Sequence, residues 1–230
     1  MKIVLIHGQN HKGSTYHIGR LLADQIPESE ISEFFLPRDL NHFCLGCYRC
    51  VEDEAQCPFY EEKQKILDKM ADAELLIFTT PTYCLRASAP MKSFIDLTFT
   101  NWMSHKPKAS MFHKKAVVIS TAAGAGAGSA VKDISTALLY WGVPYIKTYG
   151  IAIQAMSWDG VAEKKKAKIE ANMKKLASKL SRQKIHVSLK TKGIFFIMRM
   201  MQKGGMGSSP TEKAYWQSQG WLDSGRPWKV

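Results

Sequence analysis

Short apolar runs alternate along this chain with segments in which apolar residues recur at helical spacing. Five runs rich in Val, Ile, Leu and Phe predict buried strands, at residues 2–7, 31–36, 74–79, 115–121 and 145–153. Helical periodicity follows these runs at residues 15–25, 60–71, 91–99, about 129–141 and 159–181. Strands that alternate with helices predict an α/β fold, in which helices cover both faces of a doubly wound parallel sheet.

Three loops of unusual composition follow predicted strands, at residues 8–14, 81–88 and 122–129. In an open parallel sheet the carboxyl ends of the strands meet at one edge, and ligands bind in the crevice beyond that edge. We therefore expect these loops to build one binding site.

Residues 183–230 do not continue the alternation. They hold an apolar amphipathic run (194–201), a glycine-rich break (204–209) and two late aromatic motifs, Tyr215-Trp216 and Gly220-Trp221-Leu222. The predicted organisation is a main domain at residues 1–182 and a C-terminal arm at residues 183–230, which is too short for a core of its own. We interpret its tryptophans as packing of the arm against the domain, and its apolar content as contacts in a homodimer or tetramer.

Composition limits the class of protein. The chain has 230 residues, 45% of them hydrophobic, which suffices for one domain with a full core. No run of eighteen apolar residues predicts a membrane span, and no leader pattern opens the chain, so we expect a cytoplasmic protein with no membrane partner. Five cysteines, an odd number, argue against a disulfide framework.

The formal net charge of +12 is concentrated on the long helix predicted at residues 159–181. A solvated helix face is the favoured interpretation, and attraction of an acidic electron-transfer partner or of nicotinamide phosphates is the alternative. No nucleic-acid motif accompanies the charge, so no nucleic-acid partner is predicted. The lysines concerned are Lys164, Lys165, Lys166, Lys168, Lys174, Lys175 and Lys179.

Four cysteines fall within fourteen residues, in the pattern C-x2-C-x2-C-x6-C followed by Pro58. Thiolates this close in sequence can converge on one point, and soft sulfur ligands suit an iron–sulfur cluster or zinc. A metal-free loop of reduced thiols is the third interpretation. The spacing does not decide between a cluster, zinc and a metal-free loop. The candidate ligands are Cys44, Cys47, Cys50 and Cys57.

Residues 8–15 read G-Q-N-H-K-G-S-T between a predicted strand and a predicted helix. A strand that turns through glycines into a helix presents free backbone N–H groups, and the helix dipole favours an anion there. Ser14 and Thr15 add hydroxyl groups, while Gln9, His11 and Lys12 supply polar or positive neighbours. The segment matches neither the Walker P-loop nor G-x-G-x-x-G.

With the other motifs, the chain resembles the flavodoxin-like NAD(P)H-dependent FMN reductases, and within them the iron–sulfur flavoproteins. The resemblance is carried by residues 8–15, by C-x-G-C-x-x-C-x6-C at 44–57, by A-D-A-E-L-L-I-F-T-T-P-T-Y at 71–83 and by A-P-M-K-S-F-I-D at 89–96. The late Tyr215-Trp and Gly220-Trp-Leu motifs also look like the family's tail. The resemblance implies five parallel strands in the order 2-1-3-4-5.

The resemblance also assigns cofactor contacts. It implies that the FMN phosphate is held by Gln9, His11, Ser14 and Thr15. It implies that the isoalloxazine and ribityl groups are lined by Pro81, Thr82, Tyr83, Cys84 and Leu85, and that the far edge of the ring is closed by Ala122, Ala123, Gly124 and Gly126. For Cys84 alone, we favour a small buried core cysteine over a thiol that tunes the flavin.

The function that the resemblance implies is an FMN-dependent oxidoreductase. It would take hydride from NAD(P)H and pass electrons to a quinone, a flavin, another small-molecule or protein acceptor, or an iron–sulfur cluster, which in cluster-bearing relatives is [4Fe–4S] held by the four cysteines. Because the cofactor supplies the chemistry, no catalytic side chain is predicted. The alternatives are an electron-transfer iron–sulfur flavoprotein without direct NAD(P)H activity, and a sensor whose cysteine loop changes order on oxidation.

Overall fold

The computed structural model describes residues 1–206 and 209–229. Residues 207 and 208 of the predicted glycine-rich break, and residue 230, lie outside the described residues. The strands are β1 (Lys2–His7), β2 (Glu30–Phe35), β3 (Leu75–Tyr83), β4 (Arg86–Ala87), β5 (Lys115–Ala122) and β6 (Tyr145–Ala152). The helices are α1 (Ser14–Asp24), α2 (Arg49–Glu52), α3 (Tyr60–Asp72), α4 (Ala89–Leu97), α5 (Ala127–Tyr140), α6 (Glu163–Arg182), α7 (Leu189–Lys203) and α8 (Pro210–Ser218), with short 3-10 turns at Glu54–Gln56, Phe99–Asn101 and Ala109–His113.

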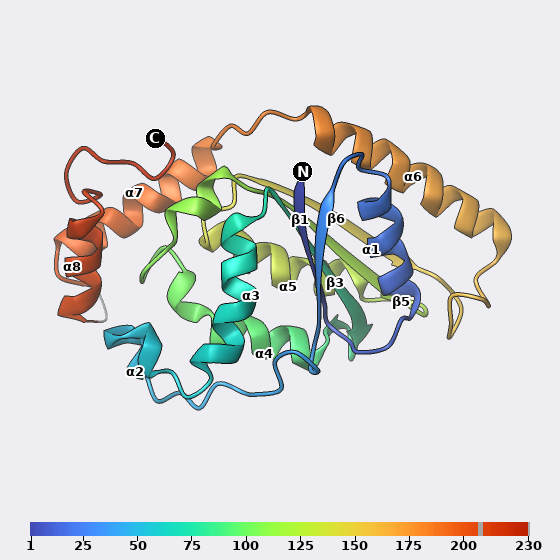
Figure 1. Cartoon of the computed structure of the whole chain (residues 1–230), viewed down its shortest axis with the longest axis horizontal. Helices are drawn as coiled ribbons and strands as arrows, with labels where there is room; N and C mark the ends of the chain where they lie inside the picture. Colours follow the sequence, from blue (N-terminus) through green and yellow to red (C-terminus); the bar gives the residue numbers. More distant parts are fainter. Residues whose placement is uncertain (207–208, 230) are drawn as a thin grey trace.

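Five parallel strands form the sheet in the order β2-β1-β3-β5-β6, which confirms the predicted flavodoxin-like order and fold class. The additional strand β4 pairs antiparallel with the end of β3. Helices cover both faces (Figure 1): α1 and α6 lie on one, and α3, α4 and α5 on the other. The central strands β1, β3 and β5 are almost entirely buried, as expected for apolar runs covered on two sides.

Two predicted boundaries differ from the structure for physical reasons. The third strand, predicted to end at residue 79, continues to Tyr83, because its last residues gain antiparallel hydrogen-bonding partners in β4. The long charged helix begins at Glu163 rather than at Asp159, because residues 159–161 form a turn that contains Gly160. The lysines of α6 are exposed or half-buried, as predicted for a solvated face.

The arm folds back onto the main chain and forms a third apolar cluster. Trp216, Trp221 and Phe195 pack there with Met103 and Phe112 of the main domain. The indole Nε1 of Trp216 donates a hydrogen bond to the carbonyl of His105 at 2.7 Å. This confirms that the arm's tryptophans pack against the domain. In Figure 1, α7 and α8 lie beyond the layered domain, at one end of its long axis.

Candidate functional site

Three loops meet beyond the carboxyl ends of β1, β3 and β5. They are the β1–α1 loop (residues 8–13), the β3–β4 turn and the β5–α5 loop (residues 123–126). These three strands are direct neighbours in the sheet, with β3 between β1 and β5. The predicted convergence of the loops at one edge of the sheet is therefore present.

Paired hydroxyl groups join the elements that carry these loops. The Oγ1 atoms of Thr15 on α1 and Thr121 on β5 lie 3.1 Å apart, and both residues are buried. The hydroxyl of Thr82 on β3 lies 2.9 Å from that of Ser120 on β5. The Ser120 hydroxyl also donates to the carbonyl of Thr80 at 2.7 Å. These short bonds fix the spacing between the first turn of α1 and the ends of the two central strands.

A second set of bonds holds the start of the β1–α1 loop. The buried Ser88 hydroxyl donates to the carbonyl of Gly8 at 2.7 Å, and the Gly8 amide donates to the carbonyl of Thr79 at 2.7 Å. A Cβ at Gly8 would lie 2.6 Å from Ser88 Oγ, so glycine is required for this approach. Sequence reasoning included Ser88 in the loop at 81–88 without assigning it a role, and it missed Ser120 and Thr121, because hydroxyls on a buried strand carry no motif of their own.

The first turn of α1 presents donors for an anion. Its cap residue is Gly13, which has no side chain to bond the free N–H groups, and the turn contains no carboxylate. Ser14 and Thr15 are buried at the base of this turn, while Gln9 is half-buried and His11 is exposed. The imidazole of His11 lies against Gly13, where a Cβ would come within 2.7 Å of its Nε2. This geometry suits a phosphate group.

The β3–β4 hairpin turns through Cys84 and Leu85, which both have positive φ, +49° and +63°. A two-residue turn of this kind normally uses Asn-Gly, so its sequence gave no turn signal. Each such residue costs about 1–2 kcal/mol of backbone strain, and strain of this size is concentrated at functional sites. Tyr83, Cys84 and Leu85 are all exposed, with Pro81 and Thr82 half-buried behind them. The interpretation of Cys84 as a buried core residue was wrong, because the turn places it at the tip of the hairpin.

The β5–α5 loop approaches this hairpin closely at Gly126. Its φ is +92°, and a Cβ there would lie 2.8 Å from Leu85 Cα and 3.0 Å from Thr82 Cγ2. Ala122 is buried at the end of β5, whereas Ala123 and Gly124 are exposed. The main chain at Gly126 therefore packs directly against the hairpin, and a side chain at this position would separate the two loops. Beside this contact, the exposed Ala123 and Gly124 present main chain with small side chains, which a flat ring can approach closely.

A fourth loop, between β6 and α6, also reaches this edge, and sequence reasoning missed it. The amide of Gln154 donates to the carbonyl of Ala123 at 3.0 Å, and Lys165 Nζ donates to Gln154 Oε1 at 2.6 Å. In the same loop, Trp158 stacks on His17 of α1, with ring centroids 5.4 Å apart. The one signal that could have indicated this loop was topological. Because β6 pairs in parallel with β5, its carboxyl end lies at the same edge of the sheet.

Behind the β1–α1 loop lies a buried histidine. His7 Nδ1 lies 2.8 Å from Thr79 Oγ1, and Nε2 lies 3.2 Å from Glu33 Oε1. Burial lowers the pKa of His7 below its ordinary value of 6.5, and the hydrogen bond to Glu33 opposes this shift. The imidazole is therefore neutral near pH 7 and braces the end of β1 against β3.

We expect this histidine to make stability fall with acidification. In the unfolded chain His7 has a pKa of 6.5, above its value in the fold. The unfolded state therefore binds more protons below that pH, and the free energy of unfolding decreases as pH falls through 6.5. Urea unfolding at several pH values from roughly 8 to 5 should show a shallower slope for His7→Asn than for wild type. The exposed His186→Asn is the matched control, and equal slopes in all three proteins would contradict this role.

The four-cysteine segment lies apart from the three loops, at the start of α3. Cys50 is buried, Cys57 is half-buried, and Cys44 and Cys47 are exposed. All four line one narrow cavity of about 20 Å³, which is closed by apolar residues: Leu45, Tyr48, Pro58, Phe59, Leu97 and Phe99. Within residues 1–206 and 209–229, no three His, Cys, Asp or Glu side chains are close enough to hold a metal ion. The cysteines share a cavity, then, but their sulfur atoms are not gathered.

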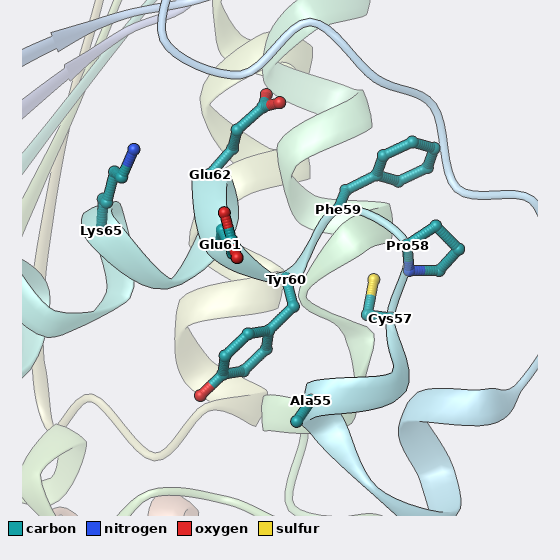
Figure 2. Close-up of a pocket in the computed structure, with 8 residues that line it drawn as sticks. All are labelled: Ala55, Cys57, Pro58, Phe59, Tyr60, Glu61, Glu62 and Lys65. Atoms are coloured by element: carbon teal, nitrogen blue, oxygen red, sulfur yellow. The ribbon is translucent and has the colours of Figure 1, made fainter.

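Figure 2 shows the turn that leads from Cys57 into α3. The thiol of Cys57 and the ring of Pro58 stand on the turn, and Tyr60 points away from Phe59. An open pocket of about 460 Å³ lies there and is also lined by Glu61, Glu62 and Lys65. Its wall is polar and acidic, and it contains no residue of the three loops, so it is a poor match for a phosphate-bearing cofactor.

The C-terminal arm contacts the cysteine segment. The hydroxyl of Thr211, at the start of α8, donates to the carboxylate of Glu52 in α2. From the main domain, Lys106 Nζ donates to the carbonyl of Glu52 at 3.1 Å, and Lys108 forms an ion pair with Glu54 at 2.8 Å. The segment is thus supported by α8 on one side and by residues 106–108 on the other.

Comparison with known proteins places this geometry in context. The model of the family described as NADPH-dependent FMN reductase matches residues 1–156. An iron-sulfur flavoprotein of Methanocaldococcus jannaschii is 33% identical over 100 residues, which are 42% of this chain and 51% of that protein. An iron-sulfur flavoprotein of Archaeoglobus fulgidus is 26% identical over 98 residues, 42% of this chain and 48% of that protein. The matched segment thus spans about half the length of each relative.

Solved structures share the fold at low sequence identity. An FMN-dependent NADH-azoreductase from Bacillus anthracis, in complex with FMN, superimposes with a TM-score of 0.61 at 11% identity, covering 79% of this chain and 100% of that chain. An NAD(P)H:quinone oxidoreductase from Methanothermobacter marburgensis also gives a TM-score of 0.61, at 14% identity, covering 79% of this chain and 97% of that chain. At such identities the likeness establishes the flavodoxin-like fold alone.

Proposed function

Because this chain belongs to the NADPH-dependent FMN reductase family, we propose that it binds FMN between its three loops and oxidises NAD(P)H, passing the electrons to an acceptor such as a quinone or another flavin. The observation that carries the proposal is the contact of Gly126 with the exposed Cys84–Leu85 turn, at the same sheet edge as the uncapped first turn of α1. This edge offers exposed loops with small side chains beside an anion site, as a flavin with a phosphate requires.

The residues present fit the phosphate end of FMN. The backbone N–H groups of the first turn of α1 and the hydroxyls of Ser14 and Thr15 would donate to the phosphate oxygens, with Gln9 and His11 at the rim. Thr15 can act as a donor without losing its position, because its Oγ1 is held 3.1 Å from that of Thr121.

The two facing loops fit the ring end. Pro81 to Leu85 would contact the ring from one loop, and the main chain of residues 122–126, which carries only small side chains, would contact it from the other. When bound, FMN accepts electrons as hydride and releases them in pairs or singly. The chain's own residues would bind FMN and orient it, and the exposed hairpin tip would leave one face of the ring accessible. Because FMN itself supplies the chemistry, no acid–base side chain is required.

The test is anaerobic mixing of the purified flavin-loaded protein with NADH or NADPH. A reductase should bleach the flavin absorbance rapidly and re-oxidise when a soluble quinone is added. Flavin that is bound but not bleached by either nucleotide would contradict the NAD(P)H-dependent activity and leave FMN binding intact. Protein that does not bind FMN would refute the site itself.

We predict that Thr15→Ala weakens FMN binding about tenfold or more, because a hydrogen bond to a charged phosphate contributes about 1.5–3 kcal/mol. Flavin content after exhaustive dialysis, and a fluorescence titration of the apoprotein with FMN, measure the effect. Thr148→Ala on the exposed part of β6 is the control and should leave the affinity unchanged. Equal affinity of the two variants would remove Thr15 from the phosphate site.

A second candidate is an electron-transfer iron–sulfur flavoprotein without direct NAD(P)H activity. It is supported by four cysteines lining one cavity, and by a pattern of soft donors that suits a [4Fe–4S] cluster. Cys44, Cys47, Cys50 and Cys57 would be the ligands. Because Cys44 and Cys47 are exposed on the loop that leads into α2, the loop would have to close for the sulfurs to converge.

The iron content of anaerobically purified protein tests this second candidate. If the cysteines hold a cluster, we expect about four irons and matching sulfide per chain, with broad visible absorbance beneath the flavin bands. Cys57→Ser should lose most of the iron, whereas the matched variant Cys84→Ser, on the hairpin tip, should keep it. Wild-type protein with flavin and no iron would exclude the cluster under these conditions.

A further inference from the structure

Helix α7 (Leu189–Lys203) turns an apolar face toward solvent. Leu189, Phe196, Ile197 and Met200 are between 49% and 85% exposed, and Met206 just beyond the helix is 67% exposed. Positions 189, 193, 196, 197 and 200 follow the spacing of a single helix face, and position 193 is glycine. A surface helix ordinarily turns such an apolar stripe toward the core. An apolar stripe that faces solvent instead indicates a contact surface for another molecule or for a membrane.

The orientation of α7 is held by its opposite face. Thr191, Phe195 and Gln202 are buried in the arm's cluster, and Gln202 Nε2 donates to the carbonyl of Ser104 at 2.9 Å. The Arg199 guanidinium donates to main-chain carbonyls of the C-terminal segment, among them that of Trp221 at 2.9 Å. The helix cannot rotate its exposed stripe inward without breaking these contacts.

Positive charge borders the exposed stripe on both sides. On a helical projection, Lys190 lies at one border and Lys192 and Lys203 lie at the other, and all three are exposed. In the part of the chain that the structure describes, none of these three lysines forms an ion pair. The sequence contains no Asp or Glu between Glu170 and Glu212, so α7 and its flanking segments carry basic residues and no acidic ones.

We propose that α7 docks flat onto an anionic phospholipid surface, with its apolar stripe in the headgroup–acyl boundary and its lysines at the lipid phosphates. An apolar face bordered by lysines is the pattern of an interfacial helix, and long lysine side chains can keep their charge at the surface while the stripe is buried. No helix among the described residues is long and apolar enough to cross a membrane, so the contact is peripheral. The proposed lipid contact departs from the expectation of no membrane partner. That expectation rested on the lack of an apolar run long enough to span a membrane.

Charge complementarity favours lipid over a second copy of the chain. Two α7 stripes packed against each other would bring two lysine borders together without a carboxylate from either helix, and such like-charge contacts are costly. An anionic lipid surface satisfies both features of the face, its apolar centre and its basic border, and each lysine adds to the attraction.

Vesicle flotation of the full chain tests the proposal. The probes are vesicles of phosphatidylcholine alone, and of phosphatidylcholine and phosphatidylglycerol in equal parts. We expect binding to the anionic vesicles, weak binding to the neutral ones, and release by high salt. Phe196→Ser with Ile197→Ser should lower binding on the order of a hundredfold. Lys190→Gln with Lys192→Gln should lower it about twentyfold. Lys174→Gln with Lys175→Gln, on α6, is the charge-matched control.

Sedimentation of the same proteins without lipid tests the alternative, that a second copy of the chain covers the apolar stripe of α7. A wild-type dimer that Phe196→Ser with Ile197→Ser converts to a monomer, together with no binding to anionic vesicles, would overturn the proposal in favour of a second copy. Equal binding of wild type and both α7 variants to anionic vesicles would overturn it as well, because attraction would then come from net charge alone. Circular dichroism of the variants, all at exposed positions, checks that each keeps the fold.

Discussion

Replacing Gly126 by alanine is expected to lower FMN affinity about a hundredfold or more. Gly126 has φ of +92°, and an added Cβ would lie 2.8 Å from the Cα atom of Leu85 and 3.0 Å from Thr82 Cγ2. The left-handed conformation costs a non-glycine residue about 1–2 kcal/mol, and the overpacking about 1–3 kcal/mol more. Without ligand, the exposed loop can relieve both by moving away from the hairpin. With FMN bound it cannot, so the cost appears in the affinity.

Gly128→Ala is the matched control, two residues further along. No described atom lies within 4 Å of a Cβ built at Gly128, and its backbone is helical in α5. Alanine there should leave FMN affinity unchanged and stabilise the helix by a few tenths to about 1 kcal/mol. Titration of both apoproteins with FMN, followed by flavin fluorescence, measures the difference. If Gly126→Ala binds FMN as well as Gly128→Ala, the β5–α5 loop does not contact the flavin.

The second large effect is expected at Phe195. Its side chain is 1% exposed and packs at ring-centroid distances of 5.0 Å from Trp216 and 5.7 Å from Trp221. Phe195→Ala should lower the free energy of unfolding by about 3–5 kcal/mol, because it leaves a cavity in the cluster that joins the arm to residues 103–112. The adjacent Phe196, at 55% exposure, should change stability by less than about 0.5 kcal/mol when replaced by alanine.

Urea unfolding, followed by tryptophan fluorescence, measures both variants. FMN content of the folded Phe195→Ala protein should match wild type, because the arm's cluster contains no residue of the three loops. This pattern would support the proposed division into residues 1–182 and 183–230. The two adjacent phenylalanines separate two roles: Phe195 for stability and Phe196 for the proposed lipid contact. Equal destabilisation by both variants would contradict this assignment.

The elements that could be predicted are those whose signal is local. Buried strands such as Lys115–Ala122 appear as unbroken apolar runs, and α1 follows a glycine turn with helical periodicity. The β4 strand and the Cys84–Leu85 turn could not be predicted, because neither residue of the turn favours a positive φ. Tertiary pairing with β3 and the contact with Gly126 maintain that turn against its local preference.

The amino-acid sequence by itself determined the fold class, the family and the three loops at one sheet edge, because each depends on local periodicity or on motifs at short spacing. The order of the parallel strands was implied only by the resemblance to the family. The tertiary structure alone decided which hydroxyls tie those loops together, that Cys84 is exposed, and that the β6–α6 loop joins the same edge. It also decided which face of α7 is buried. The apolar residues of that helix look alike in sequence, and only their packing against Trp216 and Trp221 separates a core face from one left to solvent.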